Sequence, residues 1–276
     1  MRCLFCKDKS DHSLSIEHVV PESLGNEEHI LPRGWVCDSC NNYFARKVEK
    51  PFLENHYAVE SRFRMMVPNK KSRYPALRGM HLQSLSKIEL SHKDDDPRNG
   101  IEVDFSEGGR KRLLDMKPGE EGAFIIPHVP EPCNDITTAR FVAKIGLEVL
   151  AFGLKDVPGA NEELVGKREL DQIRVYARRG QPQIIWPISL RRIYPADFLF
   201  DNGLAPPYEV LHEFDILCTP ASEYYVVIAI FGWEYVINLG GTELDGYQEW
   251  LKENNGRSPL YSGKNANGRE KRAQAT

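Results

Sequence analysis

The chain has 276 residues, of which 41% are hydrophobic and 28% are charged, a composition that excludes a mainly disordered protein. Its 36 Lys and Arg residues against 40 Asp and Glu residues give a formal charge of −4, so any contact with nucleic acid must come from a local basic patch. No apolar run approaches the roughly 20 residues of a membrane-spanning helix, and the N-terminus has no apolar signal-peptide core. We therefore expect a cytoplasmic protein without a membrane partner.

Two cysteine pairs with C-x-x-C spacing lie near the N-terminus, Cys3 with Cys6 and Cys37 with Cys40. Each such turn can place two thiolates on one tetrahedral zinc ion, and a cytoplasmic location favours metal binding over disulfides. The alternative, four unrelated buried thiols, is disfavoured by the spacing. Residues 1–55 are too few to bury a large core, so we expect a structural Zn²⁺ to stabilise this segment.

Secondary-structure signals around the cysteine pairs predict the order β-β-α. Residues 15–20 have strand composition, and residues 31–36 form a second extended segment. A helix is expected to follow, capped by Asp38 or Ser39, until Pro51 stops or kinks it. Zinc bound by the cysteines would hold these short elements together.

Three residues within these elements are candidates for catalysis. Glu17 and His18 are adjacent on the first strand, and Asn41 directly follows the fourth cysteine. Carboxylate and amide oxygens suit Mg²⁺ or Mn²⁺, and a neutral histidine beside such an ion can deprotonate water. Neighbouring strand residues point to opposite faces, so Glu17 and His18 can meet one ligand only if the strand bends or bulges. Alternatively, His18 is a hydrogen-bonded strand residue or a zinc ligand, and Asn41 makes local backbone bonds, with Asn42 the weaker metal candidate.

Four short motifs follow one another in this segment: Cys3-x-x-Cys6, Ser15-Ile16-Glu17-His18-Val19-Val20-Pro21, Leu24-Gly25 and Cys37-Asp38-Ser39-Cys40-Asn41-Asn42. Together they resemble the HNH endonucleases of the ββα-metal type, over residues 1–55 only. The resemblance implies that His18 is the general base that activates water for attack on a phosphodiester. It also implies that Glu17 and Asn41 hold a single catalytic metal ion.

The chain departs from the family pattern at three positions. The family's middle asparagine, which fixes the loop geometry, would fall on Pro32, and Asn26 replaces a second glycine after the Leu-Gly pair. The metal-binding acid is Glu17, where Asp is commoner. The departure at Pro32 leaves open which side chain supports the loop beside the base.

Residues 61–81 form a basic segment without an acidic residue, and Phe63 and Tyr74 are interleaved in it. Basic side chains contact phosphates, and aromatic rings can stack on bases. The alternative is a solvated basic loop that balances an acidic remainder. We predict that the segment contacts nucleic acid, with DNA as the expected partner. The predicted contact residues are Lys47, Arg62, Arg64, Lys70, Lys71 and Arg73.

The remaining sequence predicts a larger α+β domain with an antiparallel sheet and a hairpin turn at Gly232. Helices are expected at residues 137–152, 169–178 and 243–252. Strands are expected at residues 87–91, 101–105, 123–128, 183–193, 208–218, 223–231 and 234–239. Gly153 is expected to end the first helix, and Cys133 and Cys218 are expected to be buried core thiols.

The predicted fold class is therefore α+β, a small zinc-stabilised ββα-metal HNH module followed by a larger α+β domain. The expected divisions are the module at 1–55, a basic linker or nucleic-acid-contacting loop at 56–82, the α+β domain at 83–262 and a disordered tail at 263–276. The larger domain would serve specificity, sensing or dimerisation, and a homo-oligomer is left open. By family analogy, such a protein acts in defence or in a mobile element.

Two functions from different classes fit the sequence. The first is a metal-dependent HNH endonuclease, with structural Zn²⁺, catalytic Mg²⁺ or Mn²⁺, and His18 as base. The second is a zinc-ribbon protein that binds nucleic acid without catalysis. The joint presence of Glu17, His18 and Asn41 favours the enzyme, since a structural ribbon has no need of all three.

Overall fold

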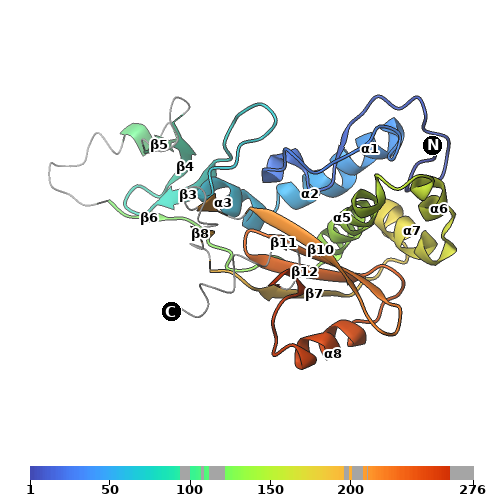
Figure 1. The fold of residues 1–276 in the computed structure, drawn as a ribbon. Helices are drawn as coiled ribbons and strands as arrows, with labels where there is room; N and C mark the ends of the chain where they lie inside the picture. The colour runs from blue at the N-terminus through green and yellow to red at the C-terminus, as the bar shows by residue number, and fades with distance from the viewer. Residues whose placement is uncertain are drawn as a thin grey trace. The chain divides into compact units, whose positions relative to one another are not determined.

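The structure is a computed structural model that describes residues 1–93, 100–106, 109–111, 122–195, 199–200, 208–209 and 211–261. Its fold is α+β, as predicted, with helices and antiparallel sheets (Figure 1). The chain divides into two compact units, one formed by Met1–Phe52 with Asn134–Thr276 and the other by Leu53–Cys133. The boundaries expected at residues 55 and 82 stay a prediction, and the expected tail at 263–276 lies outside the described residues.

The first unit is built on an antiparallel sheet in the order β10-β11-β12-β7. Its strands are β7 (Ile188–Arg192), β10 (His212–Cys218), β11 (Tyr224–Ile230) and β12 (Trp233–Asn238). The predicted hairpin turn joins β11 to β12 through Phe231 and Gly232, whose φ angles of 50° and 81° suit a two-residue turn. A second ladder in this unit is short and pairs β8 (Leu199–Phe200) with β9 (Tyr208–Glu209).

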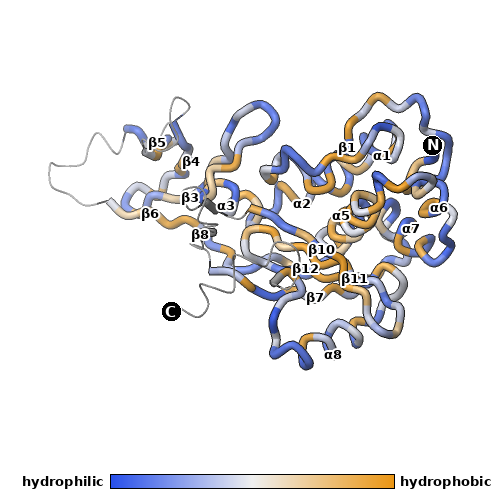
Figure 2. The backbone as a smooth tube through the Cα atoms, viewed as in Figure 1, coloured by the Kyte–Doolittle hydropathy of each residue, from blue (hydrophilic) through white to orange (hydrophobic). Residues whose placement is uncertain are grey.

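Helices cover both faces of the larger sheet, which explains why β11 and β12 are almost entirely buried. Helix α5 (Ile136–Leu154) packs on one face, where Gly146 lies so close that a Cβ there would be 3.2 Å from Ile237. Helix α8 (Asp245–Glu253) covers the other face, where Tyr247 joins a core with Val227. The apolar colouring concentrates along α5 and these strands (Figure 2).

Helix α5 and the helices beside it differ in part from those that the sequence predicts. Asp135 caps α5 by accepting a hydrogen bond from the amide of Thr138, and the helix continues through Gly153, so the predicted end at Gly153 was wrong. Helix α6 (Ala160–Gly166) was not predicted. A short 3₁₀ turn, η4 (Arg168–Leu170), precedes the expected helix, α7 (Asp171–Arg179).

The N-terminal segment has the predicted β-β-α order. Its elements are β1 (Glu17–His18), η1 (Glu22–Leu24), β2 (Ile30–Leu31), α1 (Asp38–Phe44), the π-helical η2 (Ala45–Glu49) and α2 (Lys50–Leu53). The π turn just before Pro51 lets the helix continue despite the missing proline N–H, because the preceding amide, Lys50 N–H, bonds to Ala45 O, five residues back. Phe52 then stacks on Phe141 of α5, with ring centroids 3.8 Å apart. This contact joins the N-terminal segment to the rest of the first unit.

The second unit contains a sheet in the order β5-β4-β3-β6 and the helix α3. Its elements are α3 (His56–Arg64), β3 (Leu77–His81), β4 (Ser86–His92), β5 (Ile101–Phe105) and β6 (Phe124–Ile125). Phe63 of α3 packs with Leu77 and Leu90 in its core. Within the described ranges, no helix has both the length and the apolar character needed to cross a membrane.

The two remaining cysteines contradict the prediction of core thiols. Cys133 and Cys218 are both exposed. Cys218 is the last residue of β10, which lies at the edge of its sheet, so no further strand covers it. Cys133 lies in the extended segment before α5 rather than in a packed element.

Candidate active site and zinc site

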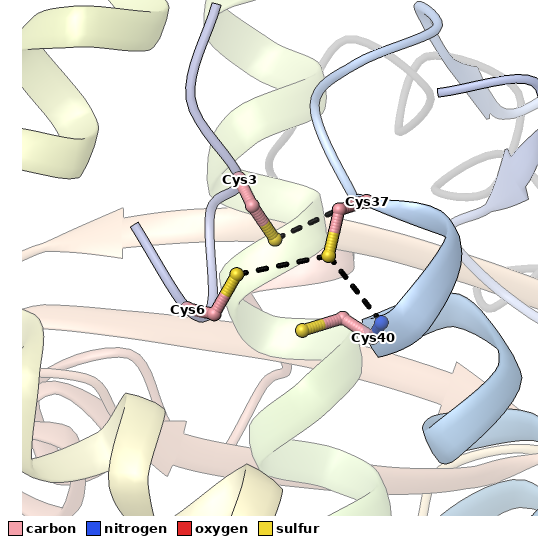
Figure 3. Close-up of side chains that lie close together, drawn as sticks. All are labelled: Cys3, Cys6, Cys37 and Cys40. Atoms are coloured by element: carbon pink, nitrogen blue, oxygen red, sulfur yellow. Dashed lines mark hydrogen bonds between the residues drawn. The ribbon is translucent and has the colours of Figure 1, made fainter. Parts of the chain in front are cut away.

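Cys3, Cys6, Cys37 and Cys40 form one cluster, whose Sγ atoms all lie within 4.8 Å of one another (Figure 3). Cys37 is the N-cap of α1, where its sulfur accepts a hydrogen bond from the Cys40 amide at 3.4 Å. The Cys37 amide in turn donates to the sulfur of Cys3 at 3.3 Å. The two C-x-x-C turns therefore converge as predicted, in an arrangement that can hold a tetrahedral zinc ion.

The electrostatics of the cluster also fit a bound dication. A hydrogen bond from the Cys40 thiol lowers the pKa of Cys3 to about 5. Burial raises the pKa of Cys6 to about 12, and the hydrogen bond to Cys3, with burial, raises that of Cys40 well above its usual range. Four thiols this close cannot all ionise to thiolates without a compensating cation, which Zn²⁺ would supply.

Arg174 of α7 supports the first cysteine turn from within the first unit. Its side chain is 2% exposed and donates from Nε to the carbonyl of Leu4, between the first two cysteines, at 2.8 Å. The same guanidinium also donates to the carbonyls of Leu164 and Lys167 and binds Asp171. Sequence reasoning missed this residue, because nothing local in the sequence distinguishes a buried arginine from a solvated one on helix α7.

Two side chains of α1 hold the segment that leads into β1. Asp38 does not cap the helix as predicted; its carboxylate instead accepts hydrogen bonds from the amides of Leu14 and Ser15 and from the Ser15 hydroxyl. The Ser15 hydroxyl and these amides hold the pKa of Asp38 below its usual range. Asn41 donates from Nδ2 to the carbonyl of Ile16 at 3.1 Å. Helix α1, which contains Cys40 and is capped by Cys37, thus positions the strand that contains Glu17 and His18.

The His18 side chain is 18% exposed, and its Nε2 lies 4.0 Å from a carboxylate oxygen of Glu22. Its Nδ1 is buried and has no hydrogen-bond partner among the described residues. A buried ring nitrogen in this condition normally requires a polar partner. An imidazole nitrogen without a hydrogen-bond partner can accept a proton, which is what a general base requires.

Glu17 points away from solvent and into a buried ionic cluster. Its Oε1 lies 2.5 Å from Nζ of Lys144, a fully buried residue of α5. The same Nζ lies 2.7 Å from Glu49 of η2 and 2.9 Å from Glu148, one turn further along α5. We call these four residues the Lys144 cluster. Among the described residues, Glu17 and His18 therefore contact different charged groups, Lys144 and Glu22.

The charges of the Lys144 cluster are unequal, with three carboxylates around one ammonium. Burial opposes the charged form of Lys144, yet the carboxylates raise its pKa well above the usual range. Burial, with the neighbouring Glu17 and Glu49, raises the pKa of Glu148 well above its usual range, against the attraction of Lys144. Sequence reasoning did not predict this cluster, since Lys144 is separated from Glu17 by 127 positions.

The loop between β1 and β2 is fixed by Asn26, which is fully buried. Its Nδ2 donates to the carbonyls of Val20 at 2.7 Å and His29 at 3.1 Å. Its Oδ1 accepts from the amides of Glu28 at 3.2 Å and His29 at 2.9 Å. This answers the question left by Pro32, because the asparagine that stands in place of a second glycine supports the loop.

His29 lies in the loop directly before β2, and its ring packs against the larger sheet. Its ring contacts Phe152 of α5 and both His212 and Phe214 of β10, with centroids 4.9 to 5.8 Å apart. Burial lowers the pKa of both His29 and His212. The end of the loop between β1 and β2 therefore packs against α5 and β10 inside the first unit.

The predicted nucleic-acid contacts fall into two groups. Arg62 is 7% exposed and Phe63 lies in the core of the second unit, so neither presents its side chain to solvent. Arg64 pairs with Glu60 but stays 64% exposed. The other predicted contacts are all exposed: Lys47, Lys70, Lys71 and Arg73.

The exposed cations at 70–73 belong to a compact turn organised by Asn69. Its side-chain oxygen accepts hydrogen bonds from the amides of Lys71 at 2.8 Å and Arg73 at 3.2 Å. Its backbone amide donates to the carbonyl of Arg73. The turn therefore directs several basic side chains outward from an ordered backbone.

Comparison with known proteins finds one family that the N-terminal segment resembles. Residues 3–57 match the family model of HNH endonucleases. The match spans both cysteine pairs, β1, the Asn26 loop and α1, which agrees with the resemblance found in the sequence. No curated protein and no solved structure matches the chain.

The resemblance implies two metal ions, which can be compared with the donor atoms that the described residues offer. The four-cysteine cluster suits Zn²⁺ by donor type and separation. For a hard divalent ion, Asn41 uses its Nδ2 in the bond to Ile16 and leaves Oδ1 as an oxygen donor. Glu17 engages Lys144 through Oε1, which leaves Oε2 as the second oxygen donor.

Proposed function

We propose that the protein is a metal-dependent endonuclease that hydrolyses phosphodiester bonds in nucleic acid, with DNA as the expected substrate. The observation that carries the proposal is His18, whose buried Nδ1 lacks a partner among the described residues, on a strand held by the zinc-anchored helix α1. The match of residues 3–57 to HNH endonucleases supports it. The four-cysteine cluster would hold structural Zn²⁺ and keep α1 in place.

In the proposed reaction, the imidazole of His18 accepts a proton from water as the water oxygen attacks phosphorus. The bond from phosphorus to the 3′-oxygen breaks, and the leaving oxygen takes a proton from solvent, giving a 5′-phosphate and a 3′-hydroxyl. His18 then returns its proton to solvent. Glu17 and Asn41 would hold Mg²⁺ or Mn²⁺, which supplies Lewis-acid stabilisation of the charge on the phosphate and the leaving oxygen. A carboxylate oxygen of Glu22 lies 4.0 Å from Nε2 of the same ring.

Substrate binding is proposed for the exposed basic residues of the predicted set. Lys70, Lys71 and Arg73 project from the Asn69 turn and can contact phosphates, with Arg64 and Lys47 as further contacts. Buried Arg62 is the least suited of the predicted set. Aromatic stacking remains a proposal for Tyr74 alone, since Phe63 is a core residue.

The test is cleavage of supercoiled plasmid by the zinc-loaded protein with Mg²⁺ or Mn²⁺. Native protein should nick the plasmid, His18→Ala should not, and His12→Ala, which changes an exposed histidine in the same segment, should behave as native. Equal nicking by native protein and His18→Ala would assign the activity to another site or to a contaminant.

A second function, a zinc-ribbon protein that binds nucleic acid without cleaving it, is favoured by one observation. The carboxylate of Glu17 already contacts a cation, the ammonium of Lys144. If Lys144 replaces the catalytic metal, neither Mg²⁺ nor Mn²⁺ would support cleavage, while plasmid would still be retained in a gel-shift assay. Retention without cleavage would therefore favour the binding protein.

A further inference from the structure

Helix α5 reaches into the N-terminal segment, although it lies outside the residues that match the HNH family. Lys144 contacts Glu17 of β1 and Glu49 of η2, and both elements belong to residues 3–57. Its side chain is fully buried, so it is shielded from the solvent that weakens surface ion pairs. The contact is therefore well placed to fix the position of a carboxylate.

We propose that Lys144 is a positioning residue that orients the carboxylate of Glu17, so that Oε2 faces the catalytic metal ion while Oε1 is held by the ammonium. This inference rests on the proposed function. It makes the region after residue 134 a functional part of the nuclease site, in addition to any role in specificity or sensing.

The geometry favours positioning over a purely structural ion pair. A glutamate on a two-residue strand has several rotatable bonds, and losing the freedom to rotate them is part of the cost of binding a metal ion. Because Lys144 already holds Oε1, the Glu17 side chain would not lose this rotational freedom when the metal ion binds. Lys144 is itself held by Glu49 at 2.7 Å and Glu148 at 2.9 Å, so its Nζ has three fixed partners. Side chains that orient metal ligands in this way typically change metal affinity by roughly 10- to 100-fold when they are removed.

The test compares two variants that differ only at Lys144. Glu148→Met removes one carboxylate and leaves Lys144 with Glu17 and Glu49. The double variant Lys144→Met with Glu148→Met removes a buried pair of opposite charges, a change that proteins often tolerate when apolar side chains replace it. Mn²⁺ binding to the full-length, zinc-loaded proteins is measured by electron paramagnetic resonance, which does not depend on cleavage.

The expected result is that Glu148→Met binds Mn²⁺ as tightly as native protein, while the double variant binds it at least about tenfold more weakly with its zinc content unchanged. Equal affinity in the two variants would overturn the inference. Tighter binding by the double variant would also overturn it, because Lys144 would then be a competitor of the metal. If the double variant loses zinc, Lys144→Leu with Glu148→Leu is compared with Glu148→Leu in the same way.

Failure of the proposed function has a different signature. Native protein and Glu17→Gln would then give the same Mn²⁺ spectrum, and this is seen before any change at Lys144. That result would remove the metal site and the inference together. In another outcome, native protein and the double variant bind Mn²⁺ equally well and Glu17→Gln does not bind it. This would overturn only the role of Lys144.

Discussion

The side-chain amide of Asn26 donates a hydrogen bond to the carbonyl of Val20, two residues beyond His18, at 2.7 Å. Asn26 is fully buried and spans the loop from Val20 to His29, the residue directly before β2. One side chain therefore closes the loop that connects the proposed base to the second strand.

Replacing Asn26 with alanine should destabilise the protein by about 2–4 kcal/mol, because buried carbonyls and amides would lose their partners. Asn42→Ala, at an exposed position of α1, is the matched control and should change stability by less than about 0.5 kcal/mol. Urea denaturation monitored by circular dichroism measures both. Equal stability of the two variants would show that Asn26 does not support the loop.

Removal of zinc should destabilise the N-terminal segment, because the two C-x-x-C turns would lose the cation that joins them. Cys40→Ser should lose stoichiometric zinc and lower the melting temperature, whereas Cys133→Ser, at an exposed thiol, should retain one zinc per chain. Atomic absorption and thermal unfolding test this. Full zinc content in Cys40→Ser would contradict a four-cysteine site.

Stability should fall on mild acidification because of His29 and His212. Burial lowers the pKa of each below the usual 6.5, so the unfolded chain takes up these protons first. The stabilising contribution is complete above about pH 6.5 and is lost as pH falls from there toward the folded-state pKa values. His29→Phe should flatten this part of the stability profile, while His12→Asn, at an exposed position, should not. Parallel profiles for His29→Phe and native protein would exclude His29 as the cause.

Close packing of α5 on the sheet predicts different effects of one substitution at two positions of that helix. A Cβ at Gly146 would lie 3.1 Å from Leu239 and 3.2 Å from Ile237, whereas at Gly153 the nearest atom belongs to Ile216 at 3.8 Å. Gly153→Ala should stabilise the protein by about 0.5–1 kcal/mol through helix propensity. Gly146→Ala should be less stable than Gly153→Ala by about 1 kcal/mol or more, because the added methyl crowds the sheet. Thermal denaturation with equal shifts at both positions would argue against this packing.

The proposed basic contact predicts a salt effect. Replacing Lys70, Lys71 and Arg73 with alanine should weaken DNA binding and make the slope of log K against log salt shallower by about 2–3, roughly one for each phosphate that is no longer neutralised. Replacing exposed Lys167 and Arg168 is the control and should leave the slope unchanged. Fluorescence anisotropy at several salt concentrations measures this. An unchanged slope in the triple variant would place the DNA-binding surface elsewhere.

Local patterns predicted much of this molecule. The C-x-x-C spacing predicted the four-cysteine cluster, and a composition rich in Ile, Val, Tyr and Phe with a glycine turn predicted the β11–β12 hairpin. The site depends equally on contacts between residues that are far apart in the sequence, which local patterns cannot predict. Lys144 meets Glu17 across 127 positions, and Arg174 meets Leu4 across 170, through packing of α5 and α7 that only the tertiary structure defines. The same applies to Cys218, whose exposure follows from its place on an edge strand.

The most direct test of His18 as the base is chemical rescue in the plasmid assay with Mn²⁺. Zinc-loaded His18→Gly should fail to nick, and added imidazole should restore nicking as its neutral form fills the place of the missing ring and accepts the proton from water. Native protein should not respond to imidazole. Nicking by His18→Gly at the native rate without imidazole would contradict the assignment of His18 as the catalytic base.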